Sequence, residues 1–357
     1  MTFVIVIAVM LVASVTTIID SINQTVLTMY GYQRYFTVLT PRNTLSIGPS
    51  STAAIKKVPH LQVMYPASAL FMRIKTIFGK TPFAVFALRH QDAAAILKRC
   101  HIHLMAGRLP SPHQAEIALS YDIAANKHIK LGGVVMSPTS RGSFSPKPIR
   151  LVGILDGPDW FALTPRSFVL DNSPIAPNGY LVSARSVKDQ IMLDKELKKA
   201  LNPAHVHIWT YAGLVHDTSS ALAYLYLILD IVVGIIIFDI AFLCGLLFNI
   251  YYAQRLPEFA VLLAMGYQRR LLIWRTLAET GLLSLIGWAI GAVLTTALLV
   301  YMQGAIFHPK GLLLNPYDIG AYRLTLPLPI AIAGFAVATI AFRLRSLDPV
   351  GIIERRQ

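Results

Sequence analysis

Long apolar runs alternate with polar stretches along the chain, and this alternation predicts four membrane-spanning helices. The apolar runs are Phe3 to Ile19, Ala221 to Ile250, Leu271 to Met302 and Leu326 to Phe342. Each run is near or above the roughly 20 residues that cross the hydrocarbon core of a bilayer. A long polar segment separates the first run from the second. The pattern therefore predicts a membrane protein with four transmembrane helices in a 1 + 3 arrangement and a domain inserted between the first and the second.

This pattern divides the chain into eight segments. We expect a first transmembrane helix at 1–20, an extracytoplasmic domain at 21–218, a second transmembrane helix with a projecting stalk at 219–254, a cytoplasmic loop at 255–269, a third helix at 270–302, an outer loop at 303–324, a fourth helix at 325–343 and a cytoplasmic tail at 344–357. A signal peptide is the rival interpretation of the first run. No clear small-x-small cleavage site follows it, so we expect a retained helix. Met1 stands almost inside the run without the usual basic flank, which leaves the true N-terminus open.

The inserted segment alternates between strand-like and helix-like stretches, which indicates an α/β-type extracytoplasmic domain, either α/β or α+β. The pattern predicts strands at 116–119, 134–137, 149–155 and 205–209, helices at 121–127 and 186–201, and a turn at 107–110.

Charge in the short loops predicts the topology. Short loops rich in Lys and Arg stay on the cytoplasmic side. The basic loop and tail contain Arg255, Arg269, Arg270 and Arg275, then Arg343, Arg345, Arg355 and Arg356, whereas the loop at 303–324 contains only Lys310 and Arg323. We therefore expect a multi-pass protein of the bacterial inner (cytoplasmic) membrane with the inserted domain outside.

Composition supports this class and argues against others. The 357 residues are 55 % hydrophobic, and the mean hydropathy of +0.55 is high for a soluble protein. The net charge is +14, and residues 24–216 hold 22 Lys/Arg against 9 Asp/Glu. No Lys/Arg run is longer than two, so we expect these charges to lie on a solvated surface and we expect no nucleic-acid partner. Attraction of this segment to anionic lipid or to an acidic cargo is left open. Cys100 and Cys244 fall in different segments and form no disulfide framework.

The cytoplasmic loop contains one short helix, expected from Leu256 to Met265. Pro257 suits a first helical position, and Gly266 suits the residue just past the end. Apolar residues surround the axis and only Glu258 interrupts them, so the helix must be covered. The cover is a cytoplasmic protein or the inner membrane interface. Its polar face is too thin for a helix lying on lipid head groups, which makes a protein the preferred cover.

The run Arg255-Leu-Pro-Glu258-Phe-Ala-Val-Leu-Leu-Ala-Met-Gly266-Tyr, followed by Glu279, resembles the loop between the second and third membrane helices of the FtsX/MacB-like ABC transporter permease family. A looser set of motifs, Gly107-Arg-Leu-Pro110, Glu116-Ile-Ala-Leu-Ser120, Leu131-Gly-Gly133-Val and Ile149-Arg-Leu-Val-Gly153, resembles the extracytoplasmic core domain of MacB-like permeases. The resemblance implies that the loop helix couples the chain to a separate cytoplasmic ABC ATPase subunit. The coupling residues it implies are Arg255, Leu256, Pro257, Glu258, Phe259, Leu262, Leu263, Met265 and Gly266.

The same resemblance implies a permease subunit that works with a second permease subunit, as a homodimer or heterodimer, and with two ATPase subunits in the lipid bilayer. ATP would be bound by the partner, so we expect no cofactor in this chain. A periplasmic adaptor is left open. Two other functions remain open as well: a transmembrane signal relay that regulates an extracytoplasmic partner without transport, and a membrane sensor without an ATPase.

Motifs for catalysis are lacking in the sequence, and we expect no catalytic residue. Gly79-Lys80-Thr81 is the nearest fragment of a Walker A motif, but Ile74 stands where the motif needs its first glycine. His101 with His103, and His205 with His207, would each put two imidazoles on one face of a strand. Two residues do not make a metal site, so we expect no metal.

Polar and small residues within the apolar runs suggest helix contacts. Asp230, Asp239 and Glu279 are intramembrane acidic candidates, because a carboxylate in an apolar span is costly. Asp230 and Asp239 are nine residues apart and point to nearly opposite helix faces. Gly287 and Gly291 form a small-xxx-small surface suited to close helix packing, within the bundle or in a dimer.

The second span is longer than a bilayer requires. Residues 221–254 would extend about 50 Å as a helix, against a core of about 30 Å. A continuous helix would transmit motion from the cytoplasmic loop to the outer domain. The alternative is a break at Gly234 that leaves a normal span and a separate connector.

Overall fold

The computed structural model describes residues 2–76, 79–173 and 176–345. The chain forms two compact units. One unit comprises Met1–Ser21, Ala223–Gln303 and Leu314–Gln357, and the other comprises Ile22–Leu222 and Gly304–Leu313. We call them the helical unit and the α/β unit. The predicted cytoplasmic tail lies outside the described residues from 346 onward.

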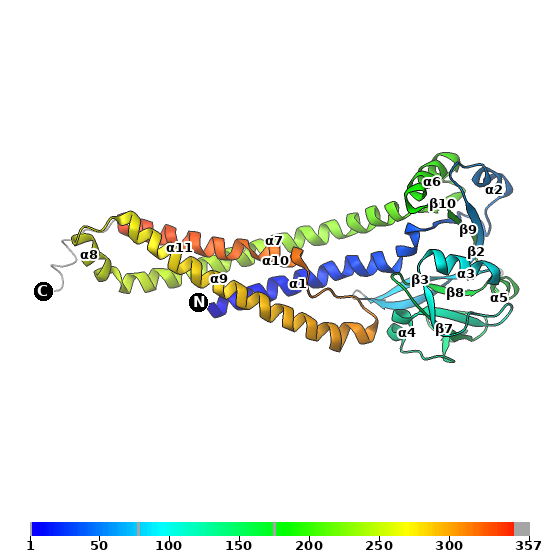
Figure 1. Ribbon diagram of the computed structural model, residues 1–357, viewed down its shortest axis with the longest axis horizontal. Helices are drawn as coiled ribbons and strands as arrows, with labels where there is room; N and C mark the ends of the chain where they lie inside the picture. The colour runs from blue at the N-terminus through cyan, green and yellow to red at the C-terminus, as the bar shows by residue number, and fades with distance from the viewer. Residues whose placement is uncertain (1, 77–78, 174–175, 346–357) are drawn as a thin grey trace. The chain divides into compact units, whose positions relative to one another are not determined.

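Among the described residues, four helices are long and apolar enough to cross a membrane, one N-terminal and three C-terminal. They are α1 (Thr2–Met29), α7 (Tyr211–Gln254), α9 (Arg269–Met302) and α11 (Pro327–Arg345), with the short helices α8 (Leu256–Ala264) and α10 (Ile319–Thr325) between them (Figure 1). The predicted fold class is confirmed: a 1 + 3 set of apolar helices with an α/β domain inserted after the first.

The helix ends differ from the apolar runs. α1 continues through polar sequence to Met29, and α7 already begins at Tyr211. Hydropathy does not detect these extensions because they are polar. α7 runs without interruption through Gly234, so the alternative of a break there is wrong. α11 begins at Pro327, where proline fits because the first turn of a helix needs no backbone donor.

The α/β unit is built on one mixed sheet, which has ten strands in the described part of the chain. Its order is β10-β1-β9-β2-β3-β8-β5-β7-β4, with β6 also pairing with β7. β3 pairs with β8 and β5 with β7 in parallel, and the other pairs are antiparallel. The strands are β1 (Thr37–Pro41), β2 (Val63–Thr76), β3 (Gly79–Leu88), β4 (His103–Gly107), β5 (Glu116–Ser120), β6 (Val134–Met136), β7 (Ile149–Asp156), β8 (Ala162–Pro165), β9 (Asn178–Ser183) and β10 (Val206–Trp209).

Helices cover this sheet and join its strands. They are α2 (Pro49–Lys56), α3 (His90–Arg99), α4 (Tyr121–Lys127), α5 (Arg166–Asn172) and α6 (Val187–Ala200), with short turns of helix at η1 (Gly31–Arg34), η2 (Gln303–Phe307) and η3 (His308–Lys310). The four predicted strands and two predicted helices of this domain are confirmed as β5, β6, β7, β10, α4 and α6. Ser186 caps α6, because its Oγ accepts a hydrogen bond of 3.1 Å from the backbone N–H of Asp189.

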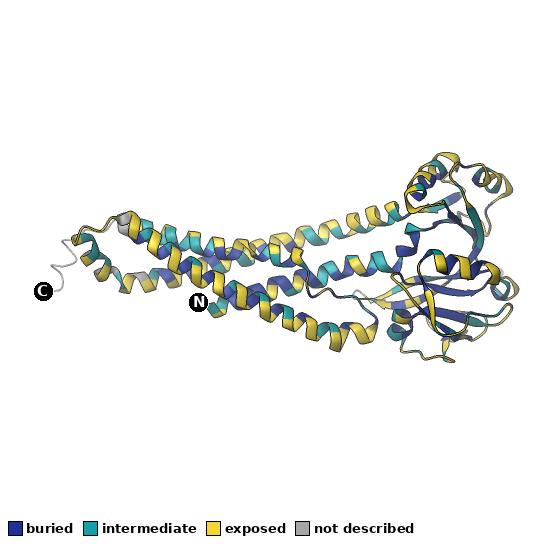
Figure 2. Ribbon diagram, in the orientation of Figure 1, coloured by how far each residue is buried: buried dark blue, intermediate teal, exposed yellow. Residues whose placement is uncertain are grey.

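The core of the α/β unit lies between the sheet and its helices. Figure 2 shows that the strands are mostly buried. One cluster packs around Trp160 and Phe83, a second around Phe36 and Phe161, and a third lies under α2 and α6. The large aromatic side chains supply much of the apolar area that stabilises the domain.

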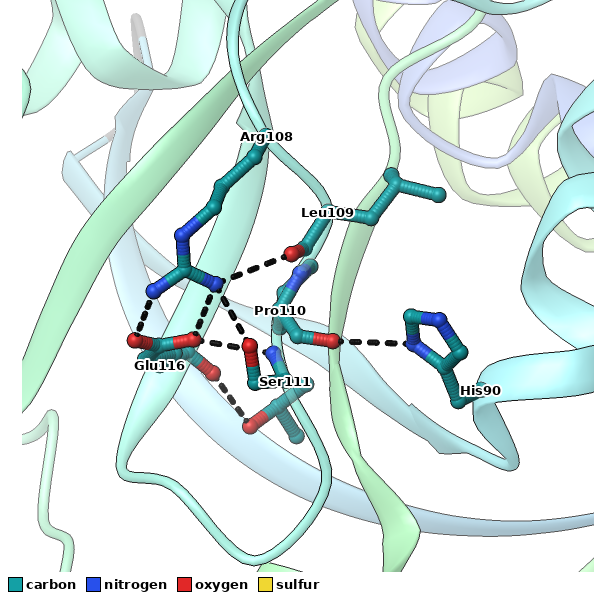
Figure 3. Close-up of polar contacts among 7 residues, drawn as sticks. His90, Arg108, Leu109, Pro110, Ser111 and Glu116 are labelled. Atoms are coloured by element: carbon teal, nitrogen blue, oxygen red, sulfur yellow. Dashed lines mark hydrogen bonds and ion pairs between the residues drawn. The ribbon is translucent and has the colours of Figure 1, made fainter.

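The predicted turn at 107–110 is fixed by an arginine (Figure 3). Gly107 is the last residue of β4 and has a positive φ of 79°. A glycine adopts this backbone conformation without strain. Arg108 Nη1 donates hydrogen bonds of 2.7 Å to both Ser111 Oγ and Glu116 Oε2, while Nη2 binds Glu116 Oε1. Pro110 O lies 3.2 Å from His90 Nδ1. The ion pair between Arg108 and both oxygens of Glu116 ties the turn to the first residue of β5.

Candidate functional site

The helix α8, in the loop between α7 and α9, has defined ends. The backbone N–H of Phe259 donates to Arg255 O at the start. At the end, Gly266 has φ +93°, its N–H donates to Leu263 O at 3.0 Å, and Tyr267 N–H donates to Leu262 O at 3.1 Å. These two bonds form a Schellman motif, which needs a residue in the left-handed region. The prediction that Gly266 follows the end of this helix is confirmed.

The inner face of α8 packs on the chain itself. Phe259, Leu262 and Leu263 are partly buried and pack against an apolar cluster of the helical unit that includes Phe248 and Leu272. The sequence predicts that this face needs a cover from outside the chain. The structure shows that membrane helices cover it, because the short loops bring α8 back onto α7 and α9.

The outer face of α8 is exposed and mainly apolar. Val261 is 51 % exposed and Met265 63 % exposed. They share one side of the helix with Glu258, at spacings of three and four residues. The side chains of Leu256, Pro257 and Ala260 lie outside the described part of the structure. We call Glu258, Val261 and Met265 the outer face of α8.

Arg255 holds α8 to its neighbours. Its Nε lies 3.4 Å from Glu258 Oε2, and its Nη1 lies 3.7 Å from Glu279 Oε1 on α9. Its guanidinium also lies 5.1 Å from the ring centroid of Tyr251 on α7. Glu279, predicted as an intramembrane acidic residue, is therefore the partner of a loop arginine.

The two acidic residues of α7 that fall within the second apolar run are exposed in the described structure. Asp230 and Asp239 make no hydrogen bond or ion pair with any residue that the structure describes. Because an unpaired carboxylate in hydrocarbon is costly, each needs water or another protein chain beside it when the helix is in a membrane.

Gly287 and Gly291 of α9 face α1. A Cβ on Gly287 would lie 3.2 Å from Ile5 Cβ, and a Cβ on Gly291 would lie 2.9 Å from Val9 Cβ. Such distances leave no room for a side chain. Within this chain, the small-xxx-small surface therefore allows close packing in the bundle.

A polar contact between three segments was not predicted from the sequence. Tyr226 Oη on α7 donates a hydrogen bond of 2.7 Å to Asp20 Oδ1 on α1. The carboxyl of Asp318, just before α10, lies beside that of Asp20, and its Oδ1 accepts from Gly320 N at 3.0 Å. The only sequence signal was an aspartate at the end of the first apolar run. Nothing local linked it to a tyrosine 206 positions away.

The histidine pairs do not share strand faces. His101 precedes β4 and has φ +57°, and His205 precedes β10, so neither pair lies within one strand. His103 Nε2 instead lies 3.4 Å from Asp156 Oδ2 across the β4–β7 pair. In the part of the chain that the structure describes, no group of three or more His, Cys, Asp or Glu side chains could hold a metal ion.

Comparison with known proteins gives one family match. Residues 231–349 match the family described as FtsX-like permease C-terminal. This part of the chain is an FtsX-like permease domain. The predicted resemblance is confirmed, and the domain includes the membrane part of α7 from Ile231 together with α8, α9 and α11. The four apolar helices and this family match indicate a membrane protein.

The other comparisons concern whole curated sequences and solved structures. No curated protein matches the chain. The periplasmic region of MacB from Actinobacillus actinomycetemcomitans superposes with a TM-score of 0.32 and 16 % identity, over 51 % of this chain and 92 % of that chain. The extracellular domain of the noncanonic ABC-type transporter YknZ from Gram-positive bacteria superposes with a TM-score of 0.32 and 13 % identity, over 49 % of this chain and 100 % of that chain.

Proposed function

We propose that this FtsX-like permease is the membrane subunit of an ABC transporter and that it couples ATP hydrolysis by a separate subunit to movement of its extracytoplasmic domain. The observation that carries the proposal is the outer face of α8. Val261 and Met265 are exposed in a short loop within the FtsX-like segment. Exposed apolar side chains grouped on one helix face are typical of a protein interaction site.

The inner face of α8 supports the same proposal. Because Phe259, Leu262 and Leu263 pack on the membrane helices, a force applied to α8 would be passed directly to them. Arg255 reinforces this connection through Glu279 on α9. The coupling surface that we propose is therefore the outer face, with the inner residues as its attachment to the chain.

The partners and location follow from this role. The ATPase would bind ATP, and this chain would need no cofactor. Two permease subunits, identical or related, would assemble with two ATPase subunits. The arginine-rich loop supports its placement in the cytoplasm of a bacterial cell, with the α/β unit outside the inner membrane. In this mechanism a cargo is exported or extracted by the moving outer domain and need not pass between the four helices.

Affinity purification from native membranes in mild detergent tests the proposal. The double variant Val261→Asp/Met265→Asp puts two charges on the outer face and leaves the inner packing intact. We expect a P-loop ATPase to co-purify with the wild type and to be lost from this variant. The matched control Val261→Leu/Met265→Leu keeps the face apolar and should retain the ATPase.

Two results would contradict the proposal. One is a wild-type preparation without any ATPase under conditions that preserve other ABC complexes, which would favour a membrane sensor. The other is full retention of the ATPase by the aspartate variant, which would remove the outer face of α8 from the interface.

A further inference from the structure

A cavity of about 390 Å³ in the α/β unit is lined by five cationic side chains and by no carboxylate. It lies between the β2–β3 hairpin, α4 and the segment that joins β6 to β7. Its charged and hydroxyl groups come from Arg73, Lys75, Lys80, Lys127, Arg141 and Ser143. Asn126 and three aliphatic side chains complete the lining.

Strand pairing forces two of these cations together. Lys75 on β2 is directly opposite Lys80 on β3, and side chains in such positions lie on the same face of the hairpin. Arg73 is two residues before Lys75 and therefore shares that face. Like charges directly opposite each other destabilise a sheet. The hairpin thus concentrates positive charge where fold stability alone would disfavour it.

Hydrogen bonds hold the ammonium group of Lys127 and the backbone of Arg73 and Lys75 at the cavity. Lys127 Nζ donates to Arg73 O at 3.2 Å and to Ser143 Oγ at 3.3 Å, and Arg73 N also donates to Ser143 Oγ at 3.2 Å. Ser143 Oγ accepts both bonds, and its own proton has no acceptor among the described contacts. Asn126 fixes the backbone of Lys75 with bonds of 2.8 Å in both directions.

Neutralising groups are missing around the cavity. In the described residues, none of the five cations forms an ion pair with Asp or Glu. Burial, and then the charges of Lys75 and Lys80, lower the pKa of Lys127. Lys127 is half-buried and the other four cations are exposed. A group of like charges without counter-charges is stabilised when an anion occupies it.

We propose that this cavity binds a multiply charged oxyanion of the phosphate class, supplied either by a soluble phosphate compound or by a lipid head group. Two arginines and three lysines are the groups that proteins use for phosphate oxygens. The volume is within the range of small-ligand sites, so it accommodates a phosphorylated group and not a folded acidic protein. The serine hydroxyl supplies a further donor.

Calorimetric titration of pyrophosphate into the full chain tests the site, with the protein in nanodiscs of phosphatidylcholine. We expect saturable binding that weakens with added salt. The variant Lys75→Gln/Lys80→Gln should weaken binding by on the order of tenfold or more, since it removes two charged hydrogen-bond donors to the anion. The control Lys188→Gln/Lys195→Gln removes the same charge from exposed positions on α6 and should bind as the wild type does.

A single variant and a stability measurement guard against misfolding. Arg141→Gln, at an exposed position, should weaken binding without a change in thermal unfolding. The Lys75/Lys80 variant should unfold no earlier than the wild type, because it relieves repulsion between two lysines. Earlier unfolding would show that the lysines stabilise the fold and would overturn the assignment.

A second arm distinguishes the source of the anion. If a lipid head group is the natural ligand, nanodiscs containing phosphatidylglycerol should reduce the apparent affinity for pyrophosphate, and the Lys75/Lys80 variant should abolish this competition. If the natural ligand is soluble, the affinity for pyrophosphate should be the same in the two kinds of nanodisc. Absence of saturable pyrophosphate binding, or equal weakening by the α6 control, would refute the site.

Discussion

Glu116, the first residue of β5, shows how one carboxylate can fix a turn. Arg108 binds both of its oxygens, and Ser111 N–H donates to Oε2 at 2.9 Å. The hydrogen bond from Arg108, opposed by burial and helped by Ser111, lowers the pKa of Glu116 below its ordinary 4.5. A lowered pKa in the folded state means that the ionised form stabilises the fold. This stabilisation is present above about pH 4.5 and is lost as the pH falls through the lower folded pKa.

The variant Glu116→Gln should therefore change the pH dependence of unfolding. At pH 7 we expect it to unfold at a lower temperature than the wild type, because it loses a two-point ion pair. As the pH falls below 4.5, the two melting temperatures should converge. Thermal unfolding of both proteins in the same detergent, measured from pH 7 to pH 3, checks this. A constant difference across the range would mean that the pair does not cause the loss of stability in acid.

At the scale of elements, α9 depends on its glycines. Gly287 and Gly291 let α9 approach α1, where Ile5 and Val9 would occupy the space of any side chain. Gly281, one and a half turns or more away on the same helix, has no atom within 4 Å of its Cβ position. The two kinds of position provide a matched comparison within one helix.

We expect Gly291→Leu to destabilise the bundle, whereas Gly281→Leu should have little effect. Overpacking a tight contact costs about 1–3 kcal/mol, and the bulk of leucine and the short distance to Val9 favour the upper part of this range. Thermal unfolding in detergent, together with the monodispersity of each preparation, measures the difference. Equal stability of the two variants would mean that α1 and α9 do not pack through these glycines.

Sequence patterns predicted the elements better than their contacts. Hydropathy identified all four membrane helices, and Pro257 and Gly266 identified α8, because these signals are local. The two-sided packing of α8 could not be predicted, since an apolar residue has the same character whether it meets its own chain or a partner. The cationic cavity was also missed, because Arg73, Lys127 and Arg141 are far apart in a sequence whose charges are scattered.

At the scale of the whole molecule, α7 is the element shared by both units. It belongs to the α/β unit through Leu222 and to the helical unit from Ala223. Its 44 residues form one helix of about 66 Å, without an internal proline. An uninterrupted helix can pass a displacement along its axis or a tilt from one end to the other, which supports the proposed coupling between α8 and the α/β unit.

Breaking α7 at Gly234 should separate ATPase binding from movement of the extracytoplasmic domain. Gly234 has no atom within 4 Å of its Cβ position, so Gly234→Ala leaves the helix intact and serves as the control. Gly234→Pro removes one backbone hydrogen bond and disrupts a helix interior at a cost of about 3 kcal/mol. We expect the ATPase to co-purify with both variants, because α8 is unchanged.

Spin labels attached to Lys188→Cys in the two permease subunits of one complex measure movement of the outer domain. The distance between the two labels should change with ATP in the alanine variant and should change little or not at all in the proline variant. Native Cys100 and Cys244 are buried, which favours labelling at the introduced site. An unchanged distance response in the proline variant would show that the outer domain is moved by another route, with α1 as the remaining helix shared by both units.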